Sequence, residues 1–236
     1  KRIADILDKA GNLIDLRKQQ LEKMDLLIKS KFIDVFGDPI ANPKGWKVEK
    51  LEKHISVIGG YAFKSNGFSK QGVPVLRIGN INSGFFKSTN LVFWNEDQTL
   101  ARYMLKPGDM IISLTGTVGK DDYGNICILG NDYSKYYLNQ RNAKLELKNT
   151  IDKRYLSNIL KMQKIKSKLT DISRGVRQAN IANADILNLS IPIPPVELQN
   201  QFAAFVEQVE KQKVVMQQSL EKMEMNYKAL MQEYFG

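Results

Sequence analysis

Two arginines and two side-chain amides lie close together between residues 173 and 180. Arg174 and Arg177 carry guanidinium groups, and Gln178 and Asn180 follow within three residues. A guanidinium group pairs with two acceptors on the edge of guanine, and an Asn or Gln amide pairs in a similar way with adenine. This combination of side chains therefore predicts a loop that reads bases.

The segment before this loop is strongly basic. Residues 153–177 hold eight Lys and Arg against one acidic residue, Asp171. Apolar residues recur at helical spacing from 155 to 169 and Asp152 is a suitable N-cap, so we expect one amphipathic helix. Its other face carries lysines that are expected to neutralise backbone phosphates, namely Lys161, Lys164 and Lys168. A solvated basic face is the alternative.

A second loop with side chains suited to phosphate spans residues 114–120. It ends in the Gly-Lys pair of a nucleotide-binding Walker loop, but Leu114 stands where that loop requires glycine and Asp121 stands where Ser or Thr would hold magnesium. A Walker loop is therefore excluded. The remaining donors are suited to phosphate oxygens or base edges, and they are Thr115, Thr117 and Lys120. An ordinary hairpin turn is the alternative.

Composition restricts other kinds of chemistry. The single histidine, His54, and the single cysteine, Cys127, cannot supply a zinc site, and we expect no metal or other cofactor. Both residues are expected to be structural. One cysteine fits a reducing cytoplasm, and no apolar run is long enough to span a membrane. The start at Lys1 has no apolar signal core, so we expect a cytoplasmic protein.

The net charge of +10 is concentrated in the middle of the chain. Residues 38–200 hold 23 basic and 14 acidic residues, whereas residues 1–37 hold eight and six and residues 201–236 hold four and five. The middle segment therefore carries most of the excess positive charge. This distribution favours an anionic partner for the middle of the chain, most commonly nucleic acid, although plain solubility is an equal alternative.

An internal repeat predicts the elements that position these loops. Residues 3–37 align without a gap on residues 202–236, and both copies place apolar residues at alternating steps of four and three. This spacing is typical of a coiled-coil seam. We therefore expect two long helices that pack as an antiparallel pair through seam residues that include Leu7, Ile14, Leu21, Met24, Ile28, Val206, Val209, Met216, Leu220, Met223 and Tyr227.

The expected domains are a helix at 1–37, a globular recognition domain at 38–200 and a second helix at 201–236. The fold class is α+β, because a mixed α/β domain is inserted between the two helices. The first helix should end near Phe36, with Gly37 as its cap. Within the inserted domain, β-rich runs predict strands at 73–78, 110–113, 126–129, 144–147 and 186–193.

Several stretches taken together resemble the DNA-specificity (S) subunit of type I restriction–modification systems. In order they are GYAFKS at 60–65, GVPVLRIGNI at 72–81, PGD at 107–109, TGTVG at 115–119, IPIPP at 191–195 and ELQ at 197–199. A helix that ends in Phe-Gly completes the match. Family members usually hold two target-recognition domains, each followed by a long helix, whereas this chain has one such domain between two helices. It therefore resembles a half-subunit or the second half of a full one.

The resemblance implies sequence-specific recognition of double-stranded DNA, with the domain at 38–200 reading one half of a bipartite site. It also implies that the helix pair sets the spacing and docks the methyltransferase (modification) subunits, and through them the restriction subunit. Catalysis would then belong to these partners, and the chain would act as a homodimer or pair with a second recognition domain. Further residues expected at the DNA are Lys64, Arg77, Gln140 and Arg141.

Two other functions remain open. A nuclease fragment would need a clustered acidic site with a lysine, and the sequence has no such cluster. A coiled-coil adaptor would use the basic middle domain to bind another protein, or to bind nucleic acid without sequence preference.

Overall fold

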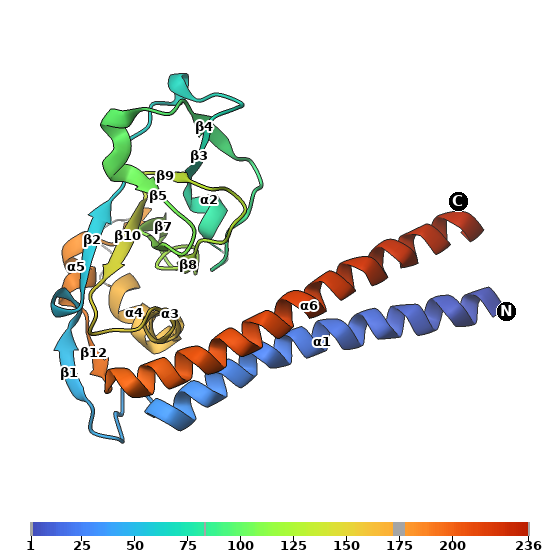
Figure 1. Ribbon diagram of the computed structural model, residues 1–236, viewed down its shortest axis with the longest axis horizontal. Helices are drawn as coiled ribbons and strands as arrows, with labels where there is room; N and C mark the ends of the chain where they lie inside the picture. The colour runs from blue at the N-terminus through green and yellow to red at the C-terminus, as the bar shows by residue number, and fades with distance from the viewer. Residues whose placement is uncertain (1, 83, 172–177, 236) are drawn as a thin grey trace. The chain divides into compact units, whose positions relative to one another are not determined.

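The computed structural model describes residues 2–82, 84–171 and 178–235 of the chain. These residues divide into two compact units, and most of their helices and strands are labelled in Figure 1. One unit comprises both ends of the chain, up to Gly37 and from Asn200 onward, and the other comprises Asp38–Gln199. Arg174 and Arg177, which the sequence assigns to base reading, lie outside the described residues.

Two long helices make up the unit formed by the chain ends. Helix α1 spans Arg2–Phe36 and helix α6 spans Val196–Phe235. Gly37 ends the first helix as expected, because its φ of 81° is left-handed and its N–H donates to the Ile33 carbonyl at 2.8 Å. The long terminal helices predicted from the repeat are therefore confirmed.

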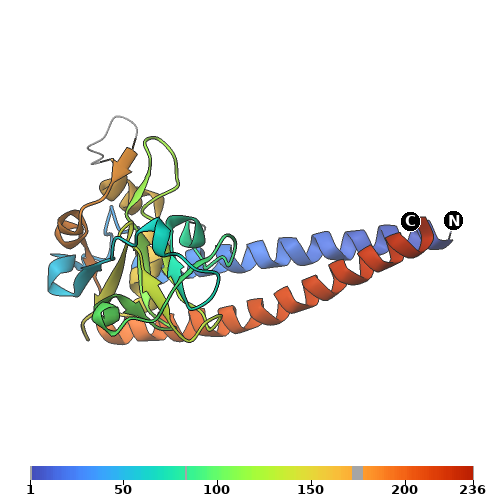
Figure 2. The same ribbon diagram turned by 90° about the horizontal axis from the view of Figure 1, so that it is seen from above.

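The two helices run antiparallel and lie side by side in both views (Figures 1 and 2). Phe36, at the end of α1, packs against Phe202, near the start of α6, with ring centroids 5.3 Å apart. Lys18 in the middle of α1 forms an ion pair of 2.8 Å with Glu224 in the second half of α6. The end of α1 thus contacts the start of α6, and the middle of α1 contacts the second half of α6, as expected for antiparallel helices.

One side of each helix is covered along most of its length. The covered positions follow the four-and-three spacing of the repeat, and all eleven seam residues named above are buried or half-buried. Arg17, Lys31 and Lys213, which interrupt the apolar seam, are half-buried in the same rows. Long basic side chains can cover a seam with their methylene stems while the charge stays in water.

The second unit is built from two four-stranded sheets and two two-stranded ones. The first four-stranded sheet has the order β2 (Ile55–Gly59), β10 (Asn142–Leu147), β6 (Met110–Ser113) and β8 (Ile126–Ile128). The second has the order β4 (Val92–Trp94), β3 (Val73–Leu76), β9 (Tyr136–Leu138) and β5 (Met104–Leu105). The two-stranded sheets pair β1 (Lys47–Lys50) with β12 (Ser190–Ile193) and β7 (Thr115–Thr117) with β11 (Gln178–Asn180).

Short helices connect these strands. The α-helices of this unit are α2 (Ile78–Ile81), α3 (Lys153–Lys161), α4 (Gln163–Thr170) and α5 (Asn183–Asn188), and the 3-10 helices are η1 (Leu51–Lys53), η2 (Ser65–Gly67) and η3 (Gln98–Tyr103). The mixture of helices and strands confirms the predicted fold class.

Strand β9 contributes to two hydrophobic cores because its side chains alternate between faces. Tyr136 and Leu138 belong to a core with Leu76, Ile111 and Cys127. Tyr137, which lies between them, belongs to a second core with Phe63, Val73, Val75 and Leu100. The GVPVLRIGNI stretch supplies residues to both cores and the GYAFKS stretch supplies Phe63 to the second, so these stretches are part of the packing that fixes the unit.

The single basic helix predicted after Asp152 is wrong. Asp152 does cap α3, since its Oδ1 accepts the N–H of Arg154 at 2.7 Å, but the chain is extended at Met162 and α4 starts afresh. A continuous helix would place buried Ile165 and Leu169 roughly 110–150° away from the middle of the buried face of α3. The break at Met162 therefore lets both apolar stripes reach the core.

The strand predicted at 186–193 is only partly correct. Strand β12 is confined to Ser190–Ile193, and the residues before it form α5. The carboxylate of Asp185 accepts the N–H of Ala182 at 2.9 Å, and this contact starts the helix where the apolar pattern suggested a strand. The strand predicted at 73–78 likewise ends at Leu76, because α2 begins at Ile78.

His54 and Cys127 make structural contacts. His54 is 5% exposed, its Nδ1 lies 2.8 Å from the Thr150 hydroxyl and its Nε2 lies 3.0 Å from the Glu49 carboxylate. Burial raises the pKa of the Cys127 thiol to about 11. Among residues 2–82, 84–171 and 178–235, no three His, Cys, Asp or Glu side chains gather to hold a metal ion, and no helix could cross a membrane.

Candidate nucleic-acid interface

Strands β7 and β11 form a two-stranded antiparallel ribbon that joins the two loops singled out in the sequence. Its register pairs Thr117 with Gln178, Gly116 with Ala179 and Thr115 with Asn180. Because side chains alternate along a strand, Thr115, Thr117 and Asn180 share one face of the ribbon. The two stretches are about 60 residues apart in sequence, and the ribbon brings their polar residues together.

The other face of the ribbon is packed against the chain. Ala179 is fully buried, and a Cβ at Gly116 would lie 2.3 Å from the carboxylate of Asp122 and 2.8 Å from the Cβ of Tyr123. Glycine is therefore required at position 116 for this close approach. The polar face is left turned outward, since the side chains of Thr117 and Asn180 are exposed.

Thr115 has a different environment from the other two polar residues. It is 8% exposed, and its hydroxyl donates to the side-chain oxygen of Asn180 at 3.3 Å. Among the residues that the structure describes, none accepts a hydrogen bond from the side-chain nitrogen of Asn180, which lies on the exposed face. Thr115 thus orients the Asn180 amide across the ribbon, while Asn180 faces any molecule that contacts this surface.

Residues 114–125 connect β6 to β8, which pair with each other as neighbouring strands. The alternative of a hairpin is correct in that this segment connects two adjacent antiparallel strands. The connection is long, however, and its first residues form β7 rather than a tight turn. The tip carries exposed Val118 and Lys120, and Gly119 has a left-handed φ of 77°.

Two carboxylates and a buried lysine anchor the base of this connection. Asp122 accepts the Thr117 N–H at 2.8 Å and the Thr117 hydroxyl at 2.9 Å. Lys166 of α4 is 5% exposed, and its ammonium group donates to the side-chain oxygen of Asn125 at 2.6 Å and pairs with Asp121. A buried ammonium group needs such partners, so these contacts fix the connection on α4.

The anchors Asp122 and Lys166 were missed by the sequence reasoning. Lys166 follows Met162 by four residues and precedes Leu169 by three, which places it on the apolar side of the segment. A lysine on an apolar stripe indicates a buried ion pair, and this signal is present in the sequence. The sequence does not indicate its partners, Asp121 and Asn125, which lie 45 and 41 residues away.

The turn between β9 and β10 lies beside the ribbon. Gln140 and Arg141 are exposed on this turn, and the Asn139 side-chain oxygen accepts the Arg141 N–H at 3.2 Å. The carbonyl of Arg141 accepts the Leu114 N–H at 2.8 Å, and the Leu114 carbonyl accepts the Ile181 N–H at 2.8 Å. These backbone bonds place Gln140 and Arg141 next to Leu114, which precedes β7, and close to Ile181, which follows β11.

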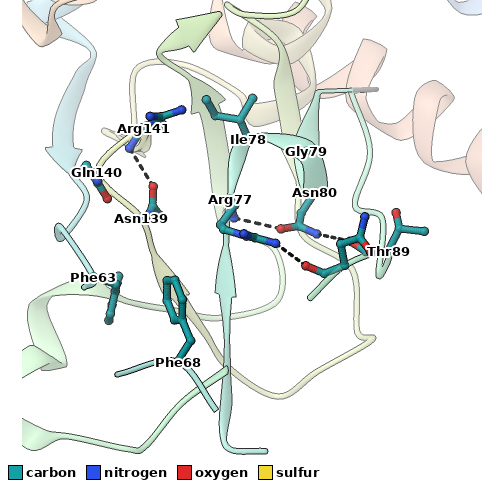
Figure 3. A pocket seen from close by; sticks show the side chains of 11 residues that line it. Phe63, Phe68, Arg77, Ile78, Gly79, Asn80, Thr89, Asn139, Gln140 and Arg141 are labelled. Atoms are coloured by element: carbon teal, nitrogen blue, oxygen red, sulfur yellow. Dashed lines mark hydrogen bonds between the residues drawn. The ribbon is translucent and has the colours of Figure 1, made fainter. Parts of the chain in front are cut away.

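Arg77 and Lys64 lie on the loops that carry the GVPVLRIGNI and GYAFKS stretches. Arg77 is half-buried at the start of α2, where it lines a cavity that also includes Gln140 and Arg141 (Figure 3). Lys64 is exposed immediately before η2. The structure thus brings Arg77 together with the β9–β10 turn.

The lysines assigned to phosphate neutralisation do not form one helical face. Lys161 lies in the last turn of α3, whereas Lys164 and Lys168 lie one turn apart on α4. All three are exposed, but Lys164 forms an ion pair of 3.3 Å with Asp38. The pKa of Asp38 is lowered chiefly by backbone N–H groups and further by Lys164, so part of this positive charge is already matched within the unit.

These features define a protein that presents an anchored polar ribbon and basic side chains from a mixed α/β unit, in a chain that begins and ends with paired long helices. The chain belongs to the type I restriction modification DNA specificity domain family, whose model matches residues 43–225.

Individual relatives agree with this assignment. The chain is 27% identical to the type I restriction enzyme MjaVIII specificity subunit of Methanocaldococcus jannaschii, over 98% of this chain and 58% of that protein. It is similar in fold to the S subunit of a type I restriction–modification system from M. genitalium, with a TM-score of 0.62 and 15% identity over 100% of this chain and 60% of that one. The HsdS subunit from Thermoanaerobacter tengcongensis gives a TM-score of 0.58 and 18% identity, over 99% and 56%. The chain thus spans little more than half the length of these relatives.

Proposed function

We propose that this chain recognises a specific sequence in double-stranded DNA and reads one half of a bipartite site. It carries no catalysis of its own and docks the modification subunits of a type I restriction–modification complex, and through them the restriction subunit. Membership of the specificity-domain family and the names of the matched relatives support this proposal. The concentration of positive charge in residues 38–200 supports it independently.

The observation that carries the proposal is the outward polar face of the β7–β11 ribbon. A two-stranded ribbon fits the major groove of B-form DNA, where each base pair presents a distinct pattern of donors and acceptors. Asn180 on this face has an amide suited to adenine. The Thr117 hydroxyl donates its proton to Asp122, so its oxygen is left to accept a hydrogen bond from a base. Arg174, Arg177 and Gln178, which precede or begin β11, extend the proposed reading set.

Basic residues around the ribbon are proposed to bind the DNA backbone. Lys120 lies at the tip of the β6–β8 connection, Lys64 lies before η2, and Lys161 and Lys168 are exposed on α3 and α4. Contacts of this kind position a protein on the duplex without reading its sequence, and they make binding weaken steeply with salt.

Helices α1 and α6 are proposed to act as a spacer and as the docking element for modification subunits. Their mutual seam leaves apolar side chains of α1 exposed, among them Ile6, Leu13, Leu16, Leu26 and Leu27. Exposed apolar residues that recur along a helix are typical of a surface that another subunit covers. We propose the same division of the chain as above, with helices at 1–37 and 201–236 flanking the reader, and assembly as a homodimer or with a second recognition domain.

Selection from a random duplex library, with the modification subunit present, tests this function. We expect enrichment of one short sequence, and we expect its affinity to exceed that for random duplex by at least about 10³-fold. Enrichment of no sequence, with equal binding to all duplexes, would instead assign the chain to non-specific binding. Binding that ignores both DNA and salt would favour an adaptor for another protein.

A further inference from the structure

A cavity of about 490 Å³ opens on the recognition unit beside the β9–β10 turn (Figure 3). Its lining comes from three stretches of chain, at 63–68, 77–90 and 139–141. The lining contains two arginines, Arg77 and Arg141, and no Asp or Glu. A concave surface with two guanidinium groups and no carboxylate is suited to an anion.

Arg77 is held in place but retains an unsatisfied donor. Its terminal nitrogen Nη2 donates to the Asn90 carbonyl at 2.6 Å, which fixes the guanidinium group in the cavity wall. Its Nε is buried and has no hydrogen-bond partner among the described residues. A buried donor without an acceptor is unfavourable, so a small movement of the Arg77 side chain that brings Nε to an oxygen of a bound molecule would be favoured.

The side-chain amide of Asn80 in the cavity wall is already occupied. The side-chain oxygen of Asn80 accepts the backbone N–H of Arg77 at 3.0 Å. The side-chain nitrogen of Asn80 donates to the carbonyls of Lys87 and Thr89, each at 3.0 Å. Asn80 therefore joins α2 to the segment that carries Asn90. The lining residues that can donate to a ligand include Arg77, Gln140 and Arg141, which lie on one side of Asn80 in Figure 3.

The aromatic residues of the lining offer little surface for a base to stack on. Phe63 is 7% exposed, and its ring packs against the rings of Tyr61, Trp94 and Tyr137 at centroid distances of 4.9 to 5.4 Å. Phe68 is half-buried and also packs on Trp94. Base binding by stacking requires an open ring face, so the cavity favours the charged part of a nucleotide over its base.

The cavity lies next to the ribbon. The Arg141 carbonyl accepts the N–H of Leu114, the residue immediately before β7. Phosphates line both edges of a DNA groove, so a ribbon inserted in the groove has phosphates at its flanks. A site one residue from the start of β7 is therefore in position to meet a phosphate of the same groove.

We propose that this cavity binds a single phosphodiester of the DNA that flanks the base-reading ribbon. Arg77 and Arg141 contact its non-bridging oxygens, and Gln140 donates to the same group or to the adjoining sugar. This inference rests on the proposed function, because the ligand is a phosphate of the recognised duplex. It makes Arg77 and Arg141 positioning residues, which set where the ribbon lies and do not themselves distinguish bases.

The test uses duplexes in which one phosphate at a time is replaced by a neutral methylphosphonate. With the wild-type chain and the modification subunit, we expect one linkage beside the selected sequence whose replacement weakens binding roughly tenfold. Arg141→Gln should weaken binding to the unmodified duplex by a similar factor. Replacing that linkage with a methylphosphonate should then cause no further loss of affinity for this variant. Its salt dependence, as the slope of log affinity against log salt, should fall by about one.

Arg102→Gln is the matched control, because Arg102 is an exposed arginine in η3 that does not line the cavity. It should keep the full response to the neutral linkage. Arg141 is exposed and its side chain makes no hydrogen bond with the described residues, so Arg141→Gln should fold normally. Arg77→Lys provides a second variant, which should keep the charge but lose the directed Nε donor and show an intermediate effect.

Three outcomes would overturn the inference. The first is specific DNA binding in which no linkage couples to Arg141, which leaves the proposed function intact. The second is wild-type binding without any sequence preference, which contradicts the proposed function as well. The third is binding of inorganic phosphate or a mononucleotide that Arg141→Gln abolishes while DNA binding stays unchanged, which would assign the cavity to a free anion.

Discussion

The helical unit and the recognition unit are held together in different ways. Seam residues of α1 and α6 make many similar apolar contacts at regular spacing, and no single one defines the geometry. The ribbon depends instead on a few individual polar contacts, chiefly those of Asp122 with Thr117 and of Lys166 with Asn125. We therefore expect seam substitutions to change stability and anchor substitutions to change what is read.

The largest effect is expected for Phe202→Ala in the helical unit. Phe202 is 1% exposed and packs against Phe32 and Phe36, so its truncation leaves a cavity that costs about 3–5 kcal/mol in free energy of unfolding. Chemical denaturation measures this change. Phe235→Ala is the control, because Phe235 is 67% exposed and should cost less than about 0.5 kcal/mol.

Phe202→Ala should not alter the base preference under conditions where the protein stays folded. An altered preference would contradict the distinction between a seam that provides stability and a ribbon that reads bases. It would mean that the seam takes part in reading the sequence. A loss of stability with an unchanged preferred sequence is the expected result.

Lys166→Met should affect both stability and reading. It removes the donor to Asn125 and the partner of Asp121, and we expect a cost of about 2–3 kcal/mol, below that of a fully buried pair because Asp121 stays in water. The freed β6–β8 connection should also lower the ratio of specific to random DNA binding. Lys168→Met, on the exposed side of α4, should leave this ratio nearly unchanged.

Asn180→Ala should act on reading alone. Its amide lies on the outward face of the ribbon, so its loss should relax the preference at one base pair by about 1–3 kcal/mol without lowering stability by more than about 1 kcal/mol. Binding to a panel of single-base variants of the selected site measures the change. Asn149→Ala, an exposed asparagine beyond β10, should bind the whole panel as the wild type does.

The smallest effect is expected for Lys164→Ala. Exposed ion pairs contribute about 0–1 kcal/mol to stability, and the pairing with Asp38 already offsets part of the lysine charge. Affinity for all sequences should fall slightly and equally, as titrations at two salt concentrations would show. A loss confined to the specific site would mean that Lys164 reads bases.

The same contrast explains how much the sequence revealed. The helix pair could be predicted because its information is periodic: each seam position is followed by another after three or four residues, and Gly37 marks an end by its backbone preference alone. Seam residues can therefore be identified from local spacing alone, without information on the distant residues that they contact.

The recognition unit could be predicted only in parts. The strands at 110–113 and 126–128 coincide with apolar runs, and the strand at 142–147 contains the alternating pattern of residues 144–147. The ribbon, however, pairs residues 115–117 with 178–180, and no local pattern indicates that pairing. The break at Met162 arises from packing and not from a helix-breaking residue. Thr117 and Asn180 were thus identified by type, whereas their shared face and the anchors Asp122 and Lys166 required the three-dimensional structure.

Guanine and adenine methylation interference on the selected site tests directly whether the β7–β11 ribbon occupies the major groove. Dimethyl sulfate modifies N7 of guanine in the major groove and N3 of adenine in the minor groove, and these positions are presented on opposite sides of a base pair. We expect binding to be blocked by guanine N7 methylation within the half-site, and we expect Asn180→Ala to leave that groove preference unchanged. Interference confined to adenine N3 would contradict a ribbon that reads the major groove.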